Sequence, residues 1–425
     1  MNTYFILILS ILLAQFLFKC VIEGVNLINF SNTLPPELAN DYPEDKYKRA
    51  QNYLKINTWF DLFESALLTI ILFTLILTGA FNKIDLFVRS FGYGEIGTGL
   101  LFFGILFLGI MIFQLPFQIY DTFVIEEKYG FNRTTPKTFI LDFLKQIALT
   151  VVLGGIALTG ILWFFETMGS YAWLYCWIAL VIYQLALFYI APTWIMPLFN
   201  KFTPLADGDL KSAIDDYAKQ EQFALKGIYT MDGSERSTKS NAFFTGFGKN
   251  RRVVLFDTLI SKHSISELVS ILAHEIGHYK YKHILKMQIF GILNAGLMLF
   301  VLSWFIKNPG LFQAFGMEHL SIYASFVFFG ILYSPIQTIL SIAFNALSRR
   351  FEYQADDYAV KSYHHPEAMT SALKKLSVDN LSNLTPHPWK VIVSYSHPTV
   401  IQRIKAIEGK KKTINSNQES VVNTQ

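Results

Sequence analysis

Long apolar segments separated by short polar ones follow one another along most of the chain. A helix needs about 20 predominantly apolar residues to cross the hydrocarbon core of a membrane. Segments of that length are Tyr4–Ile22, Trp59–Ala80, Gly99–Phe123, Phe143–Phe165, Tyr171–Phe199, Leu285–Ile306 and Ile322–Leu347. The pattern therefore predicts a mainly α-helical, polytopic membrane protein with seven transmembrane helices.

One extended polar stretch lies between the fifth and sixth segments, at residues 201–283. Its pattern predicts a helix at Asp209–Gln222. Short strands are expected at Gly227–Met231, Asn241–Phe247 and Arg252–Phe256. Gly248-Lys249-Asn250 is a turn signal, so the last two strands are expected to pair as a hairpin.

These elements predict five parts of the chain. In order they are transmembrane helices 1–5 with their loops (1–200), the cytoplasmic polar segment (201–283), transmembrane helices 6 and 7 (284–347), a C-terminal segment (348–409) and a tail (410–425). The tail is polar and lacks periodicity, so we expect it to be disordered.

Composition agrees with a membrane protein and narrows the chemistry. Hydrophobic residues make up 52% of the chain and charged residues 16%, against about 25% charged residues in soluble domains. The formal net charge is only +4, so nucleic-acid binding has no support. The two cysteines, Cys20 and Cys176, lie in apolar segments, so a metal site would use histidine and carboxylate ligands.

Lysine and arginine gather on one side of the predicted membrane. The residues on that side include Lys46, Arg49, Lys128, Arg133, the polar stretch and the basic C-terminal region. By the positive-inside rule this side faces the cytoplasm. The C-terminus carries no endoplasmic-reticulum retrieval signal, which favours a bacterial inner membrane over the endoplasmic reticulum.

The polar stretch ends in a motif typical of zinc peptidases, His274-Glu275-Ile276-Gly277-His278. Ser264 and Glu267 have the spacing of a capping box, which predicts a helix here. His274 and His278 then lie one turn apart on one face, where both imidazoles can reach one metal ion. Glu275 can act as a general base without being a ligand. The alternative is a helix whose two histidines only cap or pack.

A candidate third ligand lies where the seventh segment continues as a helix on the cytoplasmic side. Glu352 would complete the His₂Glu set of a catalytic zinc, with the fourth position left for water. Asp356, four residues later on the same face, would orient a ligand imidazole. The alternative is a solvated acidic face beside Arg349 and Arg350. The remaining histidines, among them His283, are expected to be surface or structural.

Several separated blocks resemble the CAAX prenyl protease 1 family of integral-membrane zinc metalloendopeptidases. They are Thr122–Asn132, Pro197–Leu205, Ser234–Gly246, His274–His278, Arg349–Asp356 and Ser396–Pro398. The resemblance implies seven helices enclosing a water-filled chamber, with a small cytoplasmic zincin-like α+β catalytic part. It implies one Zn²⁺ per chain, held by His274, His278 and Glu352. It also implies that His397 and Arg403 support the reacting carbonyl.

The substrate is expected to bind as an added strand, because peptides commonly extend the edge of a sheet. The residues assigned to substrate binding are Asn241, Ala242, Phe243 and Phe244. The resemblance implies cleavage near the C-terminus of prenylated CAAX-type proteins, and we expect a monomer. The first alternative is cleavage of unprenylated membrane proteins in quality control. The second is a non-proteolytic channel, transporter or scaffold with a structural zinc.

Overall fold

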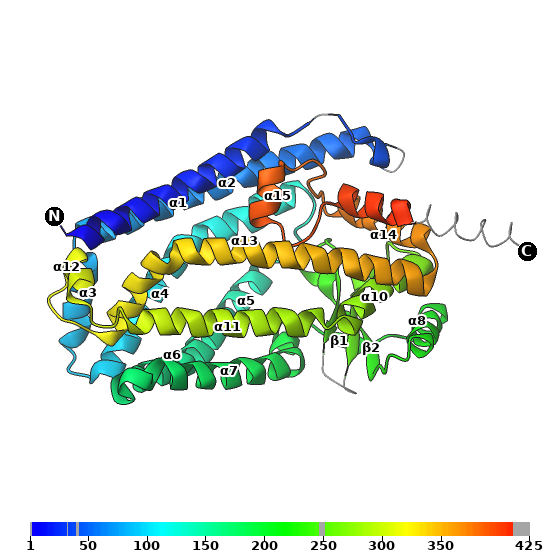
Figure 1. Ribbon diagram of the computed structural model, residues 1–425. Coiled ribbons are helices and arrows are strands. Elements are labelled where there is room, and N and C mark those ends of the chain that lie inside the picture. The colour runs from blue at the N-terminus through cyan, green and yellow to red at the C-terminus, as the bar shows by residue number, and fades with distance from the viewer. Residues whose placement is uncertain (1, 32, 40–41, 246–250, 411–425) are drawn as a thin grey trace, which may run out of the picture.

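The chain forms a long bundle of helices that carries a small sheet at one end (Figure 1). The computed structural model describes residues 2–31, 33–39, 42–245 and 251–410. Within these residues, 7 helices are long and apolar enough to cross a membrane: Thr3–Ile28, Glu44–Leu77, Glu95–Glu126, Pro136–Thr167, Gly169–Leu198, His283–Ser303 and Ile322–Tyr363. They confirm the predicted mainly α, seven-helix fold class.

Several of these long helices consist of more than one element. The elements are α1 (Thr3–Ile28), α2 (Glu44–Leu77), α4 (Glu95–Tyr120) with η2 (Asp121–Glu126), α5 (Pro136–Leu149) with η3 (Thr150–Gly154) and α6 (Gly155–Thr167), η4 (Gly169–Tyr171) with α7 (Ala172–Ile190), η5 (Ala191–Ile195) and η6 (Met196–Leu198), α11 (His283–Ser303) and α13 (Ile322–Tyr363). Large apolar side chains point outward from them, among them Trp59, Ile112 and Ile339 at 65%, 71% and 67% exposure. A bilayer would cover such a surface.

The shorter helices lie between the long ones or in the C-terminal part. They are η1 (Pro36–Leu38), α3 (Ala80–Arg89), α8 (Asp209–Gln220), η7 (Gly233–Glu235), α9 (Asp257–Ile260), α10 (Ile265–Lys280), α12 (Pro309–Ala314), α14 (Pro366–Asp379) and α15 (Pro388–Ser394). Residues 400–410 form a last helical stretch. Helix α8 confirms the helix predicted in the polar stretch.

Helix α13 is longer than a membrane requires. It runs without interruption over 42 residues, which at 1.5 Å per residue is roughly 63 Å. The hydrocarbon core is about 30 Å thick, so a large part of the helix lies beyond it. The helical continuation of the seventh segment is therefore confirmed, and this continuation carries Glu352 and Asp356.

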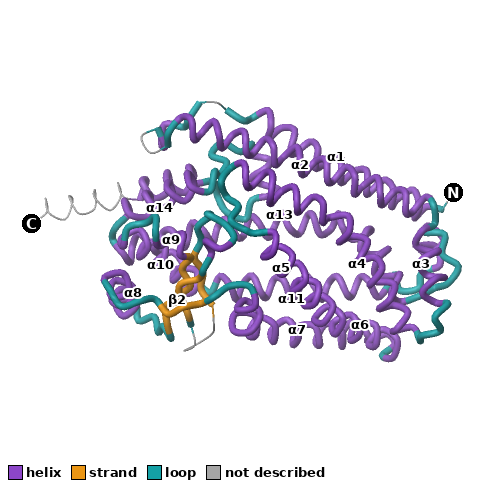
Figure 2. Tube along the Cα trace, turned by 180° about the vertical axis from the view of Figure 1, so that it is seen from behind, coloured by secondary structure: helices purple, strands orange, loops and turns teal. Residues whose placement is uncertain are grey.

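The sheet, whose strands are drawn in orange in Figure 2, has four described strands in the order β1-β2-β4-β3. The strands are β1 (Phe202–Pro204), β2 (Gly227–Met231), β3 (Ala242–Thr245) and β4 (Arg252–Phe256). Strands β3 and β4 pair antiparallel, as predicted, whereas β2 and β4 pair parallel. The sequence did not predict β1. The end of the predicted third strand, at 246–247, and the predicted turn at 248–250 lie outside the described residues.

One face of the sheet packs on α10. Leu268, Leu272 and Ile276 of that helix are buried with Val253 and Leu255 of β4 in one hydrophobic cluster. These helix positions follow the spacing of a helical stripe, while the continuous apolar run of β4 suits an inner strand. This core fixes the motif helix against the sheet and leaves its other side to face α13.

Candidate metal centre and active site

The helix that carries the two motif histidines begins as predicted. Ser264 is the N-cap of α10, where its backbone N–H donates to Glu267 Oε2 at 2.8 Å and its Oγ accepts from the Glu267 N–H at 3.4 Å. This reciprocal pair is the predicted capping box. Glu267 also accepts hydrogen bonds from Ser371 Oγ at 2.6 Å and Lys375 Nζ at 2.8 Å, both on α14. The start of α10 is thus tied to the C-terminal part of the chain.

The three predicted metal ligands meet where α10 crosses α13. The Nε2 atoms of His274 and His278 are 3.1 Å apart. Glu352 Oε2 lies 3.4 Å from His274 Nε2, and Glu352 Oε1 lies 3.3 Å from His278 Nε2. The three residues form a compact donor set from two helices.

The spacing of these donor atoms fits a zinc ion. Tetrahedral coordination with bonds of about 2.0–2.1 Å places neighbouring ligand atoms roughly 3.3 Å apart. The observed distances are 3.1 Å between the two imidazole nitrogens, and 3.4 and 3.3 Å from these nitrogens to the two different carboxylate oxygens of Glu352. Each imidazole nitrogen thus has a carboxylate oxygen at about this spacing. In addition, Glu352 Oε2 is buried and has no hydrogen-bond partner among the described residues. Buried polar atoms require a partner. The Arg403 guanidinium lies 3.5 Å from this oxygen, and a metal ion bound between the histidines and Glu352 would supply a closer one.

The charge balance of the cluster also favours a divalent cation. Three carboxylates, Glu275, Glu352 and Asp356, stand against one guanidinium, Arg403, so with neutral histidines the cluster has a surplus of two negative charges. Burial alone would lower the pKa of His274, but the Asp356 and Glu352 carboxylates beside the ring raise that pKa to about 9. The cluster therefore attracts positive charge.

Asp356 lies beside the imidazole of His274, one of the three predicted metal ligands. Its Oδ1 is 2.8 Å from His274 Nδ1. Arg403 binds the same carboxylate with two nitrogens, Nε to Oδ2 at 2.8 Å and Nη2 to Oδ1 at 2.6 Å. Arg403 Nη1 also lies 3.5 Å from Glu352 Oε2. The Arg403 side chain thus contacts the carboxylates of the cluster, and the support for the reacting carbonyl that the family resemblance implied for it stays a prediction.

Glu275 and His397 also lie at the cluster. Glu275 interacts electrostatically with His274, His278 and Glu352, and burial raises the pKa of its carboxyl group. It has no hydrogen bond to a side chain in the described part of the chain. His397 Nε2 lies 3.3 Å from Glu352 Oε1, while 62% of the His397 side chain is exposed. The two residues therefore flank the donor set, Glu275 half-buried and His397 largely open to solvent.

Strand β3 offers a free edge to a peptide, because it is the outermost of the described strands on its side. The Asn241 C=O accepts from the Phe256 N–H at 3.1 Å. Along an antiparallel pair, every second residue directs its backbone N–H and C=O groups to the partner strand. The backbone groups of Phe243, two residues after Asn241, therefore also face β4. The N–H and C=O groups of Ala242 and Phe244 therefore point to the free edge. There Asn241 Oδ1 accepts from the Ala242 N–H at 2.8 Å.

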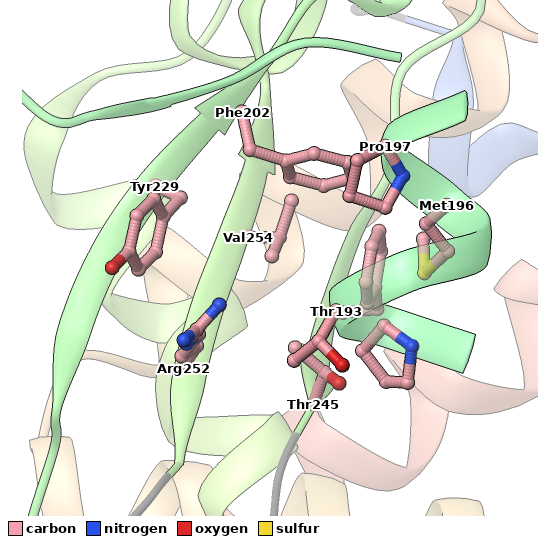
Figure 3. Close-up of a pocket in the computed structure, with 10 residues that line it drawn as sticks. Thr193, Met196, Pro197, Phe202, Tyr229, Thr245, Arg252 and Val254 are labelled. Carbon is pink, nitrogen blue, oxygen red and sulfur yellow. The ribbon is translucent and has the colours of Figure 1, made fainter. Parts of the chain in front are cut away.

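The side chains of β3 divide between the two faces of the sheet. Ala242 and Phe244 pack on the core shared with α10. Phe243 and Thr245 face the opposite side, where they line a cavity of about 60 Å³ between the sheet and the η5–η6 segment (Figure 3). Arg252 lies across the cavity with its guanidinium 5.3 Å from the Tyr229 ring. This space holds about two water molecules, so it is too small for a peptide.

A larger, mainly apolar cavity of about 370 Å³ lies beside His278, between α7, α11 and α13. Its lining includes Met287, Phe344 and His283. His283, expected from the sequence to be surface or structural, is only 2% exposed. Its Nδ1 lies 3.1 Å from His278 Nδ1. The available signal was a third histidine five residues after the motif, across the boundary between two helices.

Comparison with known proteins agrees with this arrangement. The family model described as CAAX prenyl protease N-terminal, five membrane helices, matches residues 25–201. The model of Peptidase family M48 matches residues 204–411. The two matches together cover the donor set and all the candidate membrane helices after the first, Thr3–Ile28.

Individual relatives match over nearly their whole length. The chain is 35% identical to the CAAX prenyl protease 1 homolog of Arabidopsis thaliana, over 89% of this chain and 91% of that protein. It is 32% identical to the CAAX prenyl protease 1 of Saccharomyces cerevisiae, over 93% of each. The crystal structure of S. mikatae Ste24p matches with a TM-score of 0.91 and 32% identity, over 96% of this chain and 99% of that chain. The chain therefore belongs to the CAAX prenyl protease 1 group of peptidase family M48 and is a multi-pass membrane metalloprotease.

Proposed function

We propose that this metalloprotease holds one Zn²⁺ through His274, His278 and Glu352 and cuts peptide bonds near the C-terminus of prenylated CAAX-type proteins. The observation that carries the proposal is the convergence of His274, His278 and Glu352, whose ring nitrogens and carboxylate oxygens lie 3.1–3.4 Å apart, beside the half-buried Glu275. A zinc ion bound there would act as a Lewis acid and lower the pKa of water.

Each side chain at the cluster has a proposed role. Glu275 is the general base, since its raised pKa increases its affinity for the proton that it takes from water and returns to the leaving amine. His397 is open to solvent on one side of Glu352, and we assign it a hydrogen bond to the developing oxyanion. Such a donor contributes about 2.7–4 kcal/mol. Arg403 holds the carboxylates of Asp356 and Glu352 in place through direct contacts.

The peptide binds along β3 in extended form. The free N–H and C=O groups of Phe244 and the C=O of Ala242 would pair with the substrate backbone. Asn241 turns its amide toward the same edge and would anchor the peptide there. Backbone pairing reads little side-chain identity, so many sequences would be accepted.

The prenylated substrate class has its own support. The cavity beside His278 is mainly apolar and measures about 370 Å³, which suits a hydrophobic group near the scissile bond. The water-filled chamber between the membrane helices stays a prediction. A farnesylated CAAX peptide and the same peptide without the lipid, given to the purified protein, test the substrate class. We expect faster cleavage of the farnesylated peptide, with activity lost on chelation and restored by zinc.

The alternative substrate class gives a different result in the same assay. Equal cleavage of both peptides would favour unprenylated membrane proteins and a role in quality control. The non-proteolytic channel or scaffold is not retained, because the chain belongs to a peptidase family. Either substrate class uses the same donor set.

We further propose that the donor set faces the cytoplasm and that the protein is a monomer. The first proposal rests on the distribution of lysine and arginine. A single cysteine introduced at Lys219, whose side chain is 77% exposed, should react with an impermeant maleimide only after cells are permeabilised. Reaction in intact cells would reverse the orientation. Location in a bacterial inner membrane stays a prediction.

A further inference from the structure

The two metal-binding histidines turn their second ring nitrogens to chemically different partners. Both rings direct Nε2 toward Glu352. His274 Nδ1 faces the Asp356 carboxylate at 2.8 Å, whereas His278 Nδ1 faces His283 Nδ1 at 3.1 Å. A metal-binding histidine usually donates its other N–H to a carboxylate, a backbone carbonyl or water. An imidazole in that place therefore requires an explanation.

His283 is held rigidly in this position. Its ring stacks on Phe351, with centroids 4.1 Å apart and planes at 10°, and its Nε2 lies 2.9 Å from Gln354 Oε1. Phe351 and Gln354 stand on either side of the ligand Glu352 in α13. His283 thus connects His278 of α10 to the segment of α13 that supplies Glu352.

A break between two helices makes this contact geometrically feasible. In one continuous helix, residues five apart lie roughly 140° from each other around the axis, so His283 would point away from His278. The chain instead leaves α10 at Lys280 and starts α11 at His283, with Lys282 in the left-handed region at φ 57°. The corner turns the first side chain of α11 back onto the motif.

The chain of contacts admits one proton arrangement that leaves His278 able to bind metal. The Gln354 amide oxygen only accepts hydrogen bonds, so the His283 Nε2 that faces it carries the proton. The lone pair of a neutral imidazole then lies on Nδ1, which accepts from the His278 Nδ1–H. His278 consequently keeps a lone pair on Nε2. The reverse arrangement, with the Gln354 amide nitrogen turned to His283, would place a proton on that Nε2.

We propose that His283, fixed by Gln354 and Phe351, is the positioning residue of His278: it sets the tautomer and the ring orientation in which His278 binds zinc. The inference rests on the proposed zinc site. It extends that proposal by assigning the two ligand histidines separate supports, a carboxylate for His274 and a neutral imidazole for His278.

The test measures zinc affinity of the purified full-length protein by chelator competition and the visible spectrum of its cobalt-substituted form. His283→Phe keeps a ring to stack on Phe351 but removes the acceptor. His283→Gln restores an acceptor without the ring. His319→Phe is the matched control, because His319 is exposed and lies in the segment between α12 and α13, at the end of the bundle away from α10 (Figure 1).

We expect His283→Phe to lower zinc affinity about 10–100-fold, the usual effect of removing such a partner, and to change the cobalt spectrum. His283→Gln should recover part of the affinity, and His319→Phe should match the unaltered protein. Unchanged affinity and spectrum in His283→Phe would overturn this inference while leaving the zinc site in place. If the unaltered protein binds no zinc, the proposed function and this inference fail together.

Discussion

Gly277 of α10 lies directly against Ala355 of α13: a Cβ atom on Gly277 would be 3.0 Å from the Ala355 Cα and 3.1 Å from its carbonyl oxygen. Such contacts are tighter than nine in ten real Cβ contacts, so the backbone of α13 would have to shift by a few tenths of an ångström. The crossing brings Glu352 to within 3.4 Å of the imidazoles. The glycine inside the motif is therefore what allows a ligand from a distant helix to reach the two histidines.

Gly277→Ala should consequently damage the metal site. Overpacking of this kind costs about 1–3 kcal/mol, and here it separates the two helices that carry the ligands. We expect weaker zinc binding and a lower unfolding temperature. Gly330→Ala is the control, since a Cβ on Gly330 in α13 meets no atom within 4 Å. Equal zinc affinity in both variants would contradict the proposed role of the crossing.

Replacement of Glu352 by alanine should remove most of the bound zinc. The variant keeps two imidazole ligands but loses the Glu352 carboxylate, which faces both of them. Metal content per chain, measured on purified protein by elemental analysis, checks this. Asp357→Asn changes the neighbouring acidic residue on α13 that pairs with Lys361 at 2.9 Å, and it should retain zinc. One zinc per chain in Glu352→Ala would mean that the third ligand is a different residue.

His397→Ala should lower turnover while leaving zinc in place. Its ring is largely exposed and lies 3.3 Å from a ligand oxygen, which suits an oxyanion donor. Loss of one such donor costs about 10²–10³-fold in kcat. The measurement is peptide turnover together with metal content. If zinc falls in proportion to activity, His397 supports the metal instead of the oxyanion.

The stability of the part of the chain around α10 and α14 should depend on pH through Glu267. Burial alone would raise the pKa of Glu267, but hydrogen bonds from Lys375, Ser371 and the Ser264 N–H outweigh it and lower the pKa below 4.5. A lowered folded-state pKa means that the ionised carboxylate stabilises the fold above the unfolded pKa. This contribution is lost as the pH falls through the lower, folded value.

Glu267→Gln should therefore lower the free energy of unfolding by about 1 kcal/mol near pH 7, the usual effect of a lost helix cap. The difference from the unaltered protein should shrink below about pH 4. Thermal unfolding of both proteins near pH 7 and below about pH 4 measures this difference in stability. Glu408→Gln at an exposed position provides the control. A difference that grows on acidification would mean that the Glu267 carboxylate does not stabilise the fold in its ionised form.

The sequence was sufficient for the membrane helices, the motif helix and its cap, because each depends on local periodicity or spacing. The donor set was also predictable in outline, since Glu352 lies on a helix that returns to the same side of the membrane. Strand β1 was missed because it has only three residues, Phe202–Pro204. The contacts of Arg403 with carboxylates and of His283 with His278 depend on tertiary packing, which no local pattern encodes.

Glu275 as the general base of a zinc peptidase can be checked with a single variant. The measurement compares Glu275→Gln with the unaltered protein for zinc content and for cleavage of a farnesylated CAAX peptide. Glu275 is not one of the three donors, so the variant should bind one zinc per chain and cleave no detectable peptide. Normal cleavage by the zinc-loaded variant would contradict the role proposed for Glu275.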